Sequence, residues 1–278
     1  MTVWIRIKCC LLAPLYMIFL LCCEKKQPTA NEFPYDLENP EEVYSMPVEL
    51  DEISGIFWLN ESMIACVEDN KGIVYLYDLA RKKIQRTIKF KNEGDFEDLV
   101  KVDSVFYVLH SNGTLYQVFD SGSLVVYKNN LSAVNDVEGL CYDSKNNQLL
   151  LALKGQLHKK DKDCRQIFAF NLVTKQLSDK PVLKICNEDF EALGNMKIKF
   201  RPSCLAIHPV SGQIYMVSAE ASAILRMWPD GRIIDLANLN TTIFNQPEGI
   251  TFSPEGTLYI SNEGEFGTAD IVKFSIKE

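Results

Sequence analysis

The sequence lacks the short motifs that mark many enzymes. It has no GxSxG turn, no phosphate-binding loop and no histidine-rich metal motif. Its three histidines, His110, His158 and His208, stand far from one another and from the cysteines, so we expect no zinc site. Basic residues are also in the minority, 29 against 37 acids, for a net charge of −8. This argues against nucleic acid as a partner, because phosphate binding needs clustered positive charge, and makes cations the more natural small partners.

Long apolar runs are scarce, and the one near the N-terminus is short. Residues 9–23 read CCLLAPLYMIFLLCC, fewer than the ~20 apolar residues that span a bilayer, and Pro14 interrupts them. Arg6 and Lys8 precede the run, and the polar sequence EKKQPTANE follows it. This order predicts a lipoprotein signal peptide over residues 1–22, which is absent from the mature protein.

A pair of cysteines ends this segment. The LLCC sequence is similar to the lipobox of bacterial lipoproteins, which predicts Cys23 as the lipidated residue and a membrane-anchored protein of the bacterial cell envelope, at the outer membrane. Cys22 stands where a small residue usually precedes the modified cysteine, so it is a second candidate. A plain secretory signal is the alternative. Residues 23–42, with three prolines, then read as a polar tether, and residues 43–278 as the globular domain.

Paired CxxC motifs are absent from the five cysteines that follow Cys23. Cys66, Cys141 and Cys204 lie inside apolar runs, where cysteine behaves as a small buried hydrophobe. Only Cys164 and Cys186 lie in more polar surroundings. They are therefore the one pair that we expect to be able to form a disulfide in an oxidising compartment.

An extended helical period is absent as well, and a repeat of short apolar segments takes its place. Five stretches share one plan, in which an apolar strand, a polar turn such as DSKNN or SPEG, and a second apolar strand follow one another. The common position that opens each stretch is held by Ser54, Glu97, Glu138, Ser203 and Glu248, at spacings of 43, 41, 65 and 45 residues. Repeats of about 40 to 45 residues made of short strands are typical of β-propeller blades.

The repeat predicts an all-β protein, a five-bladed β-propeller. The 65-residue interval holds about 20 extra residues for one blade, so six blades are possible if it conceals a degenerate one. The last repeat has room for only three strands. We expect VYSMPVEL at residues 43–50 to supply the fourth and close the ring, since an open edge invites aggregation. A β-sandwich with coincidental alternation is the rival interpretation.

The repeated opening position should face the central channel, because the first strand of a blade lies nearest the axis. Glu97, Glu138 and Glu248 would then put three carboxylates into one narrow space, with Ser54 and Ser203 between them. Buried like charges raise one another's pKa, and a cation relieves the conflict. Hard oxygen ligands favour Ca²⁺ over zinc or magnesium. The alternative is that each carboxylate accepts hydrogen bonds from backbone N–H groups and joins adjacent blades.

The ordered motifs ISGI, GDFEDL, VEGLCYD, PSCLAIHPVSGQIY and QPEGITFSPEGTLYISNEG together resemble the SdiA-regulated family of bacterial envelope proteins, which is distantly similar to NHL-repeat propellers. The resemblance covers nearly the whole chain after the tether. It implies a five-bladed propeller with a calcium site, no established activity, and Glu97, Glu138 and Glu248 as metal-site candidates. Cys204 replaces a glycine of the family pattern, which weakens the expectation of close backbone approach at Ser203.

Two functions compete. The first is a non-catalytic module that contains Ca²⁺ and binds a small ligand or a protein. The second is a calcium-dependent lactonase or esterase, since Glu97 and Asp98 resemble a Glu-Asp pair on the first strand of paraoxonase-like enzymes. Those sites also use Asn or Asp from other inner strands, where this chain offers Ser and Glu. We therefore favour binding and assign Asp98, with the two serines, to the channel lining; a spacer without a ligand is a third possibility.

Overall fold

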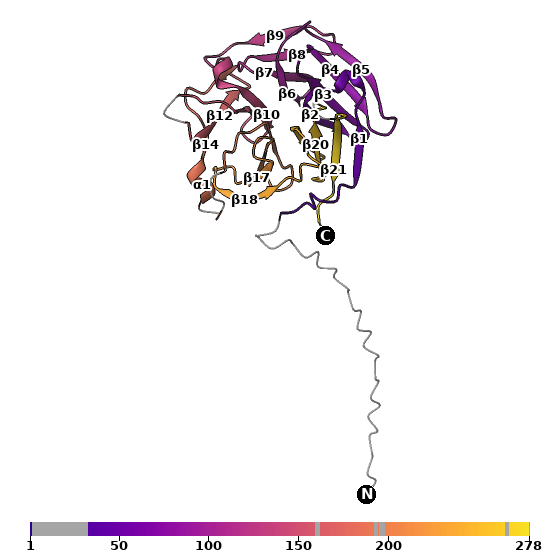
Figure 1. Ribbon diagram of the computed structural model, residues 1–278, viewed down its shortest axis with the longest axis vertical. Helices are drawn as coiled ribbons and strands as arrows, with labels where there is room; N and C mark the ends of the chain where they lie inside the picture. The colour runs from indigo at the N-terminus through magenta and orange to yellow at the C-terminus, as the bar shows by residue number, and fades with distance from the viewer. Residues whose placement is uncertain (2–32, 159–161, 192–193, 195–197, 265–266, 278) are drawn as a thin grey trace.

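The computed structural model describes residues 1, 33–158, 162–191, 194, 198–264 and 267–277. Within them, five small antiparallel sheets are arranged around a central axis as the blades of a β-propeller (Figure 1). The predicted fold class is confirmed, and the described part of the 65-residue interval holds no sixth blade. The predicted signal peptide beyond Met1, and Cys23, lie outside the described residues.

The blades follow one another along the chain, with the first strand of each nearest the axis (Figure 1). Blade 1 contains β2 (Ile53–Asn60), β3 (Met63–Glu68), β4 (Ile73–Asp78) and β5 (Lys83–Lys89). Blade 2 contains β6 (Phe96–Val102), β7 (Val105–His110), β8 (Leu115–Val118) and β9 (Leu124–Tyr127). Blade 3 contains β10 (Val137–Asp143), β11 (Gln148–Leu153), β12 (Cys164–Asn171), β13 (Gln176–Leu177) and β14 (Leu183–Cys186). Blade 4 contains β15 (Cys204–Ile207), β16 (Ile214–Ser218), β17 (Ala223–Met227) and β18 (Ile233–Asn238).

Blade 5 closes the ring by joining the two ends of the chain. It contains β19 (Pro247–Phe252), β20 (Leu258–Asn262), β21 (Asp270–Phe274) and, as its outer strand, β1 (Glu42–Ser45). The pairing of the N-terminal strand with the last blade is therefore as predicted. The strand is shorter than predicted, because Pro47 follows it and Val48–Leu50 forms a turn of 3-10 helix.

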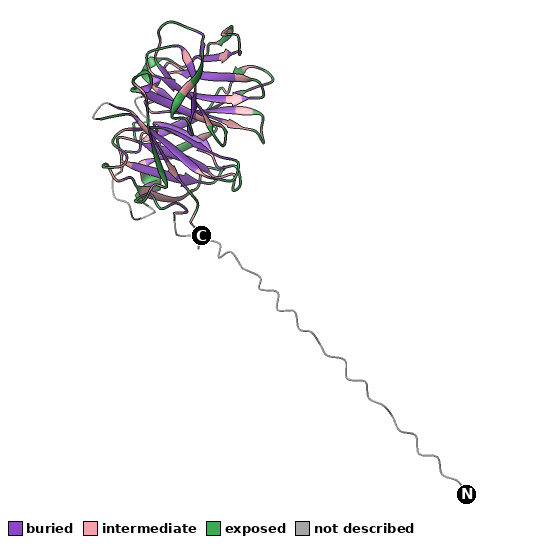
Figure 2. Ribbon diagram, turned by 90° about the vertical axis from the view of Figure 1, so that its right-hand side faces the viewer, coloured by how far each residue is buried: buried purple, intermediate pink, exposed green. Residues whose placement is uncertain are grey.

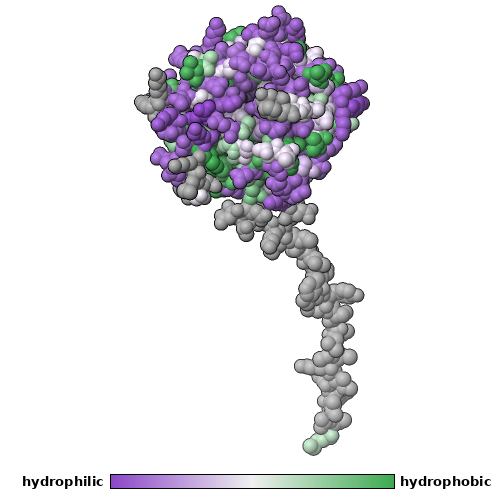
Figure 3. Space-filling view, in the orientation of Figure 1, coloured by the Kyte–Doolittle hydropathy of each residue, from purple (hydrophilic) through white to green (hydrophobic). Residues whose placement is uncertain are grey.

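The core of the protein lies between blades rather than in one centre. Five apolar clusters of buried side chains each join two neighbouring blades. Successive side chains of a strand point to opposite faces of its sheet, so each blade packs against both neighbours. The buried strands stand in two groups around the axis in Figure 2, whereas polar side chains cover most of the face shown in Figure 3, broken by small apolar patches.

The chain before β1 also belongs to this core. Tyr35 and Leu37 are buried against blades 4 and 5, and Tyr35 forms an isolated β-bridge with Ile276. This stretch falls within residues 23–42, where we predicted a polar tether. Its alternating Phe33, Tyr35 and Leu37 have the period of a half-buried strand, so the propeller begins at least by Phe33.

The long interval builds an extension of blade 3. β14 pairs with the part of β12 that extends beyond β13, and a disulfide joins Cys164 to Cys186, the pair singled out from the sequence. The short helix α1 (Asn187–Glu191) follows. The other three cysteines are free and buried, as expected. No helix in the described part of the chain is long and apolar enough to cross a membrane.

Candidate cation site at the channel mouth

The repeated opening position coincides with a local irregularity of the inner strand. In blades 1, 2, 3 and 5 the register between the first two strands shifts at Ser54, Glu97, Glu138 and Glu248, so each of these residues sits at a β-bulge. A bulge leaves one residue outside the ladder and can re-aim its side chain. The four bulges therefore lie at one end of the channel, which we call the acidic mouth.

The residue after each bulge explains part of the repeated motif. A β-carbon at Gly55 would lie 2.6 Å from the Asp98 Cα of the next blade, and one at Gly139 would lie 2.6 Å from Leu205 Cδ2. Glycine therefore follows the bulge in blades 1, 3 and 5, where inner strands approach closely, whereas blade 2 has Asp98 at this position. In blade 4 this position is Cys204, and no register shift occurs between β15 and β16, consistent with the departure noted in the sequence.

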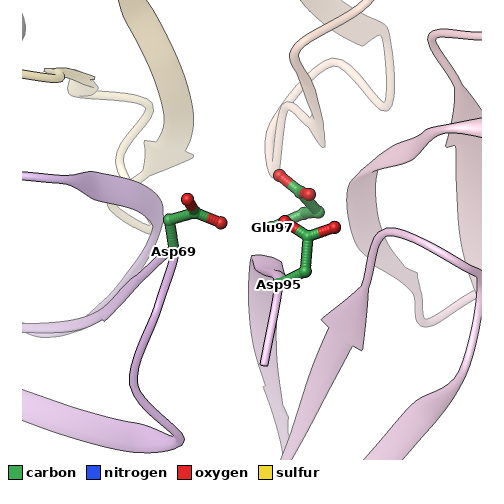
Figure 4. A group of neighbouring side chains, drawn as sticks. All are labelled: Asp69, Asp95 and Glu97. Carbon is green, nitrogen blue, oxygen red and sulfur yellow. The ribbon is translucent and has the colours of Figure 1, made fainter. Parts of the chain in front are cut away.

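Three carboxylates from two blades converge at the acidic mouth. Asp69 follows β3, Asp95 precedes β6, and Glu97 stands at the bulge of β6. One carboxylate oxygen from each lies within 4.8 Å of the others (Figure 4). Asp69 reaches across from blade 1 toward the two acids of blade 2. We call Asp69, Asp95 and Glu97 the acid triad.

Burial and mutual repulsion raise the pKa of two members of this triad, Glu97 and Asp69. Burial raises the pKa of Glu97 to about 10, and the charges of Glu138, Asp95 and Asp69 add to the effect. Burial likewise raises the pKa of Asp69 to about 7, with further contributions from a hydrogen bond to Asp95 and from its charge. A cation near these oxygens would displace the protons, because it favours the ionised carboxylates.

The other two predicted metal ligands lie beside a lysine. Lys154 Nζ is 3.2 Å from Glu138 Oε1 and also attracts Glu248 electrostatically. Burial still raises the pKa of Glu138 to about 8, whereas Lys154 lowers it. Burial raises the pKa of Glu248, against the opposing effects of Lys154 and a hydrogen bond from Ser203. Of the three glutamates, the structure thus brings only Glu97 into the triad, although its carboxylate interacts with that of Glu138.

The remaining predicted channel residues connect blades. Ser54 Oγ donates a hydrogen bond of 2.6 Å to the carbonyl oxygen of Phe96. Asp98 is 3% exposed, and its carboxyl oxygens accept hydrogen bonds from the backbone N–H groups of Leu99, at 2.8 Å, and Leu140, at 2.7 Å. Asp98 therefore fits the alternative role of a carboxylate that joins blades 2 and 3.

Two members of the triad were missing from the predicted ligand set. Asp95 stands two residues before Glu97 in GDFEDL, and Asp69 directly follows the second strand of blade 1. A shared position in every repeat singled out the glutamates, whereas the positions of Asp69 and Asp95 are acidic only in some blades, as at Asp136, two residues before Glu138. The signal available was the density of acids at these two strand ends.

These features define a five-bladed propeller with an acidic channel mouth. A family model described as SdiA-regulated matches residues 46–266, and the chain belongs to this family. The sequence matches none of the curated proteins with which it was compared.

Solved structures share the fold at low sequence identity. Glutaminyl cyclase from Myxococcus xanthus superposes with a TM-score of 0.59 at 12% identity, over 86% of this chain and 96% of that one. A luciferin-regenerating enzyme gives 0.52 at 11% identity, over 85% and 95%. A PQQ-bound aldose sugar dehydrogenase from Streptomyces coelicolor gives 0.52 at 10% identity, over 86% and 98%. At these identities the likeness supports the fold alone.

Proposed function

We propose that the protein is a non-catalytic binding module whose acidic mouth holds one divalent cation, Ca²⁺, and which a lipid anchor at Cys23 keeps at the bacterial cell envelope. The observation that carries the cation is the acid triad, whose three oxygens lie within 4.8 Å of one another. Without a cation these groups must hold protons or repel one another.

The donor set favours calcium over the other common cations. Carboxylate oxygens are hard ligands, and Ca²⁺ accepts about six to eight of them in irregular geometry, whereas Mg²⁺ requires a near-ideal octahedron. Zinc prefers nitrogen and sulfur, which the triad does not offer. A cation held by blades 1 and 2 has coordination positions left for an oxygen of a bound small molecule or protein, and these positions form the proposed ligand-binding site.

The proposed anchor is consistent with the length of the connecting segment. Phe33 lies ten positions after Cys23, and an extended chain spans at most about 3.3 to 3.6 Å per residue, so the connection reaches roughly 35 Å. A lipid at Cys23 would keep the propeller within this distance of the membrane. Metabolic labelling of the full chain with a tagged fatty acid tests the anchor, and labelling that survives in Cys23→Ser and Cys22→Ser variants alike would contradict it.

Thermal unfolding of residues 30–278 tests the cation. We expect Ca²⁺ to raise the midpoint well above its value in chelator, and Mg²⁺ to raise it less, because a ligand of the native state stabilises by mass action. The Asp95→Asn variant should lose the response to Ca²⁺. Asp120→Asn is a matched control, since Asp120 is an exposed acid that pairs with Arg86 on the outer side of the blades, and it should keep the response. Equal midpoints with Ca²⁺ and chelator in the unaltered protein would reject the proposal.

A calcium-dependent lactonase or esterase is the second candidate, and Glu138 is the observation that favours it. Its pKa of about 8 suits a group that exchanges protons near neutral pH, and it interacts electrostatically with Glu97 of the triad. Lactones and aryl esters assayed with and without chelator distinguish the two functions. Chelator-sensitive turnover that Glu138→Gln abolishes, while Ca²⁺ still raises the unfolding midpoint, would replace binding with catalysis.

A further inference from the structure

The end of the channel opposite the acidic mouth contains a second, chemically different cavity. Its volume is about 530 Å³, within the range of roughly 300 to 1,000 Å³ that is common for small-molecule sites. All five inner strands line it, beginning at Ile56, Leu99, Leu140, Leu205 and Ile250. We call this cavity the apolar pocket.

Most of the residues that line the pocket are apolar. Branched aliphatic residues from every blade line it, and Phe57, Trp58, Tyr142 and Phe252 add aromatic rings. Lys101 and Asp103 contribute one charge of each sign, and Lys101 lies over the ring of Phe106. The lining therefore favours neither an anion nor a cation, and it offers an occupant mainly apolar contact.

The pocket follows the inner strands for several residues. The lining covers three to four consecutive residues of β2 and β6, which corresponds to roughly 10 to 13 Å along the strands. The five inner strands surround this length around the axis of the propeller (Figure 1). An occupant with an apolar part of this length can therefore lie along the channel.

The N-terminal segment leaves the propeller at this same end. The hydroxyl of Tyr35 donates a hydrogen bond of 2.6 Å to the carbonyl oxygen of Gly256 and lies 3.0 Å from His208 Nε2. His208 and Gly256 belong to the turns that contain Pro209 and Pro254, which line the pocket. The segment that leads to Cys23 is thus fixed to the rim of the apolar pocket, far from the acidic mouth.

We propose that the apolar pocket binds one acyl chain of an amphiphile taken from the membrane, with the polar head remaining at the rim. The membrane as the source rests on the proposed lipid anchor, because the anchor would hold this rim toward the bilayer. The binding of an acyl chain does not rest on it, nor does it depend on the cation at the acidic mouth.

Tryptophan fluorescence reports directly on the pocket. Residues 30–278 contain two tryptophans, and Trp58 lines the pocket, whereas Trp228 is 40% exposed and does not line it. A Trp228→Phe protein therefore has Trp58 as its single emitter. Parinaric acid, a fatty acid with a linear conjugated tetraene, added from solution should quench Trp58 and gain sensitised emission that saturates at one equivalent.

A pair of charge insertions provides the control. Ile207 lines the pocket, and Val210, three residues later in the same turn, is 70% exposed and does not line it. Ile207→Glu should weaken binding at least about tenfold, because an acyl chain would bury its carboxylate, whereas Val210→Glu should change it less than about twofold. Leu59→Glu repeats the test at another blade if Ile207→Glu does not fold. Unchanged affinity in a folded pocket variant would overturn the proposal.

Uptake from vesicles tests the source. Phosphatidylcholine vesicles that contain the same fatty acid are mixed with the Trp228→Phe protein. The vesicles are then removed by centrifugation, and the fatty acid left in the supernatant with the protein is measured. Parinaric acid that remains with the soluble protein, and does not with Ile207→Glu, supports extraction from a membrane. Binding from solution without uptake from vesicles would overturn the membrane as the source. Failure of the Trp228→Phe protein to bind the fatty acid either from solution or from vesicles would overturn the pocket. Either result leaves the response of the acidic mouth to Ca²⁺ intact, so the two proposals fail separately.

Discussion

The two ends of the channel differ in chemistry although the same five strands build both. At the acidic mouth, bulges turn Glu97, Glu138 and Glu248 toward the axis, and Asp69 and Asp95 join them. A few residues further along each strand the lining is apolar. The repeat thus places acidic residues at one end of the channel and mainly apolar residues at the other. The proposed binding at either end can therefore be tested without rebuilding the other.

Asp98 lies at the boundary between the two ends, and its loss should have the largest effect. Asp98→Ala removes the acceptor of the Leu99 and Leu140 backbone N–H groups, and a buried unsatisfied donor costs about 1 to 3 kcal/mol. We expect the free energy of unfolding in urea to fall by about 3 kcal/mol. Asp120→Ala, at an exposed ion pair, should change it by less than about 1 kcal/mol. Equal effects of the two substitutions would show that Asp98 does not join the blades.

Close packing of the inner strands is the next test, because it sets the width of the channel at the bulges. Gly55→Ala would place a β-carbon 2.6 Å from the Asp98 Cα, so the backbone of blade 1 or blade 2 must move. We expect a loss of about 2 kcal/mol, typical of overpacking. Gly267→Ala meets no atom within 4 Å and should be nearly neutral in the same urea measurement. A neutral Gly55→Ala would mean that the approach of these strands is not tight in solution.

The sequence predicts which end of the channel a residue lies at better than it predicts which residues contact one another there. The spacing of Glu97, Glu138 and Glu248 is a local property of the repeat, and it places all three at one mouth. Which acids converge depends on distances between blades, and these follow from the curvature of the ring. For this reason Asp69 and Asp95 escaped the prediction. The burial of Tyr35 escaped it because the nearby prolines concealed a two-residue alternation.

Lys154 is a positive charge at the acidic mouth. Its removal should make this end of the channel more negative relative to the apolar end. In Lys154→Met, Glu138 loses its partner at 3.2 Å and Glu248 loses a nearby positive charge. We expect the metal-free protein to lose about 1 to 2 kcal/mol, less than a fully buried pair because the lysine is partly exposed. The rise in unfolding midpoint on adding Ca²⁺ should become larger, since the mouth is more negative. Lys82→Met, at an exposed pair with Glu42, should leave both quantities unchanged.

The pH dependence of stability should show the smallest effect, and Asp69 at the acidic mouth contributes a defined part of it. The pKa of Asp69 is raised to about 7, above the unfolded value of about 3.9, so the folded protein binds more protons between these values. The free energy of unfolding should therefore fall as pH rises from about 4 through 7, by on the order of 1 kcal/mol after allowance for solvent screening. Asp69→Asn should flatten this slope, and so should saturating Ca²⁺, because the cation favours the ionised triad. A slope that persists unchanged in Asp69→Asn would place the titrating group elsewhere. An Asp103→Asn variant, at the apolar pocket, should retain the full slope, which would assign the pH response to one end of the channel.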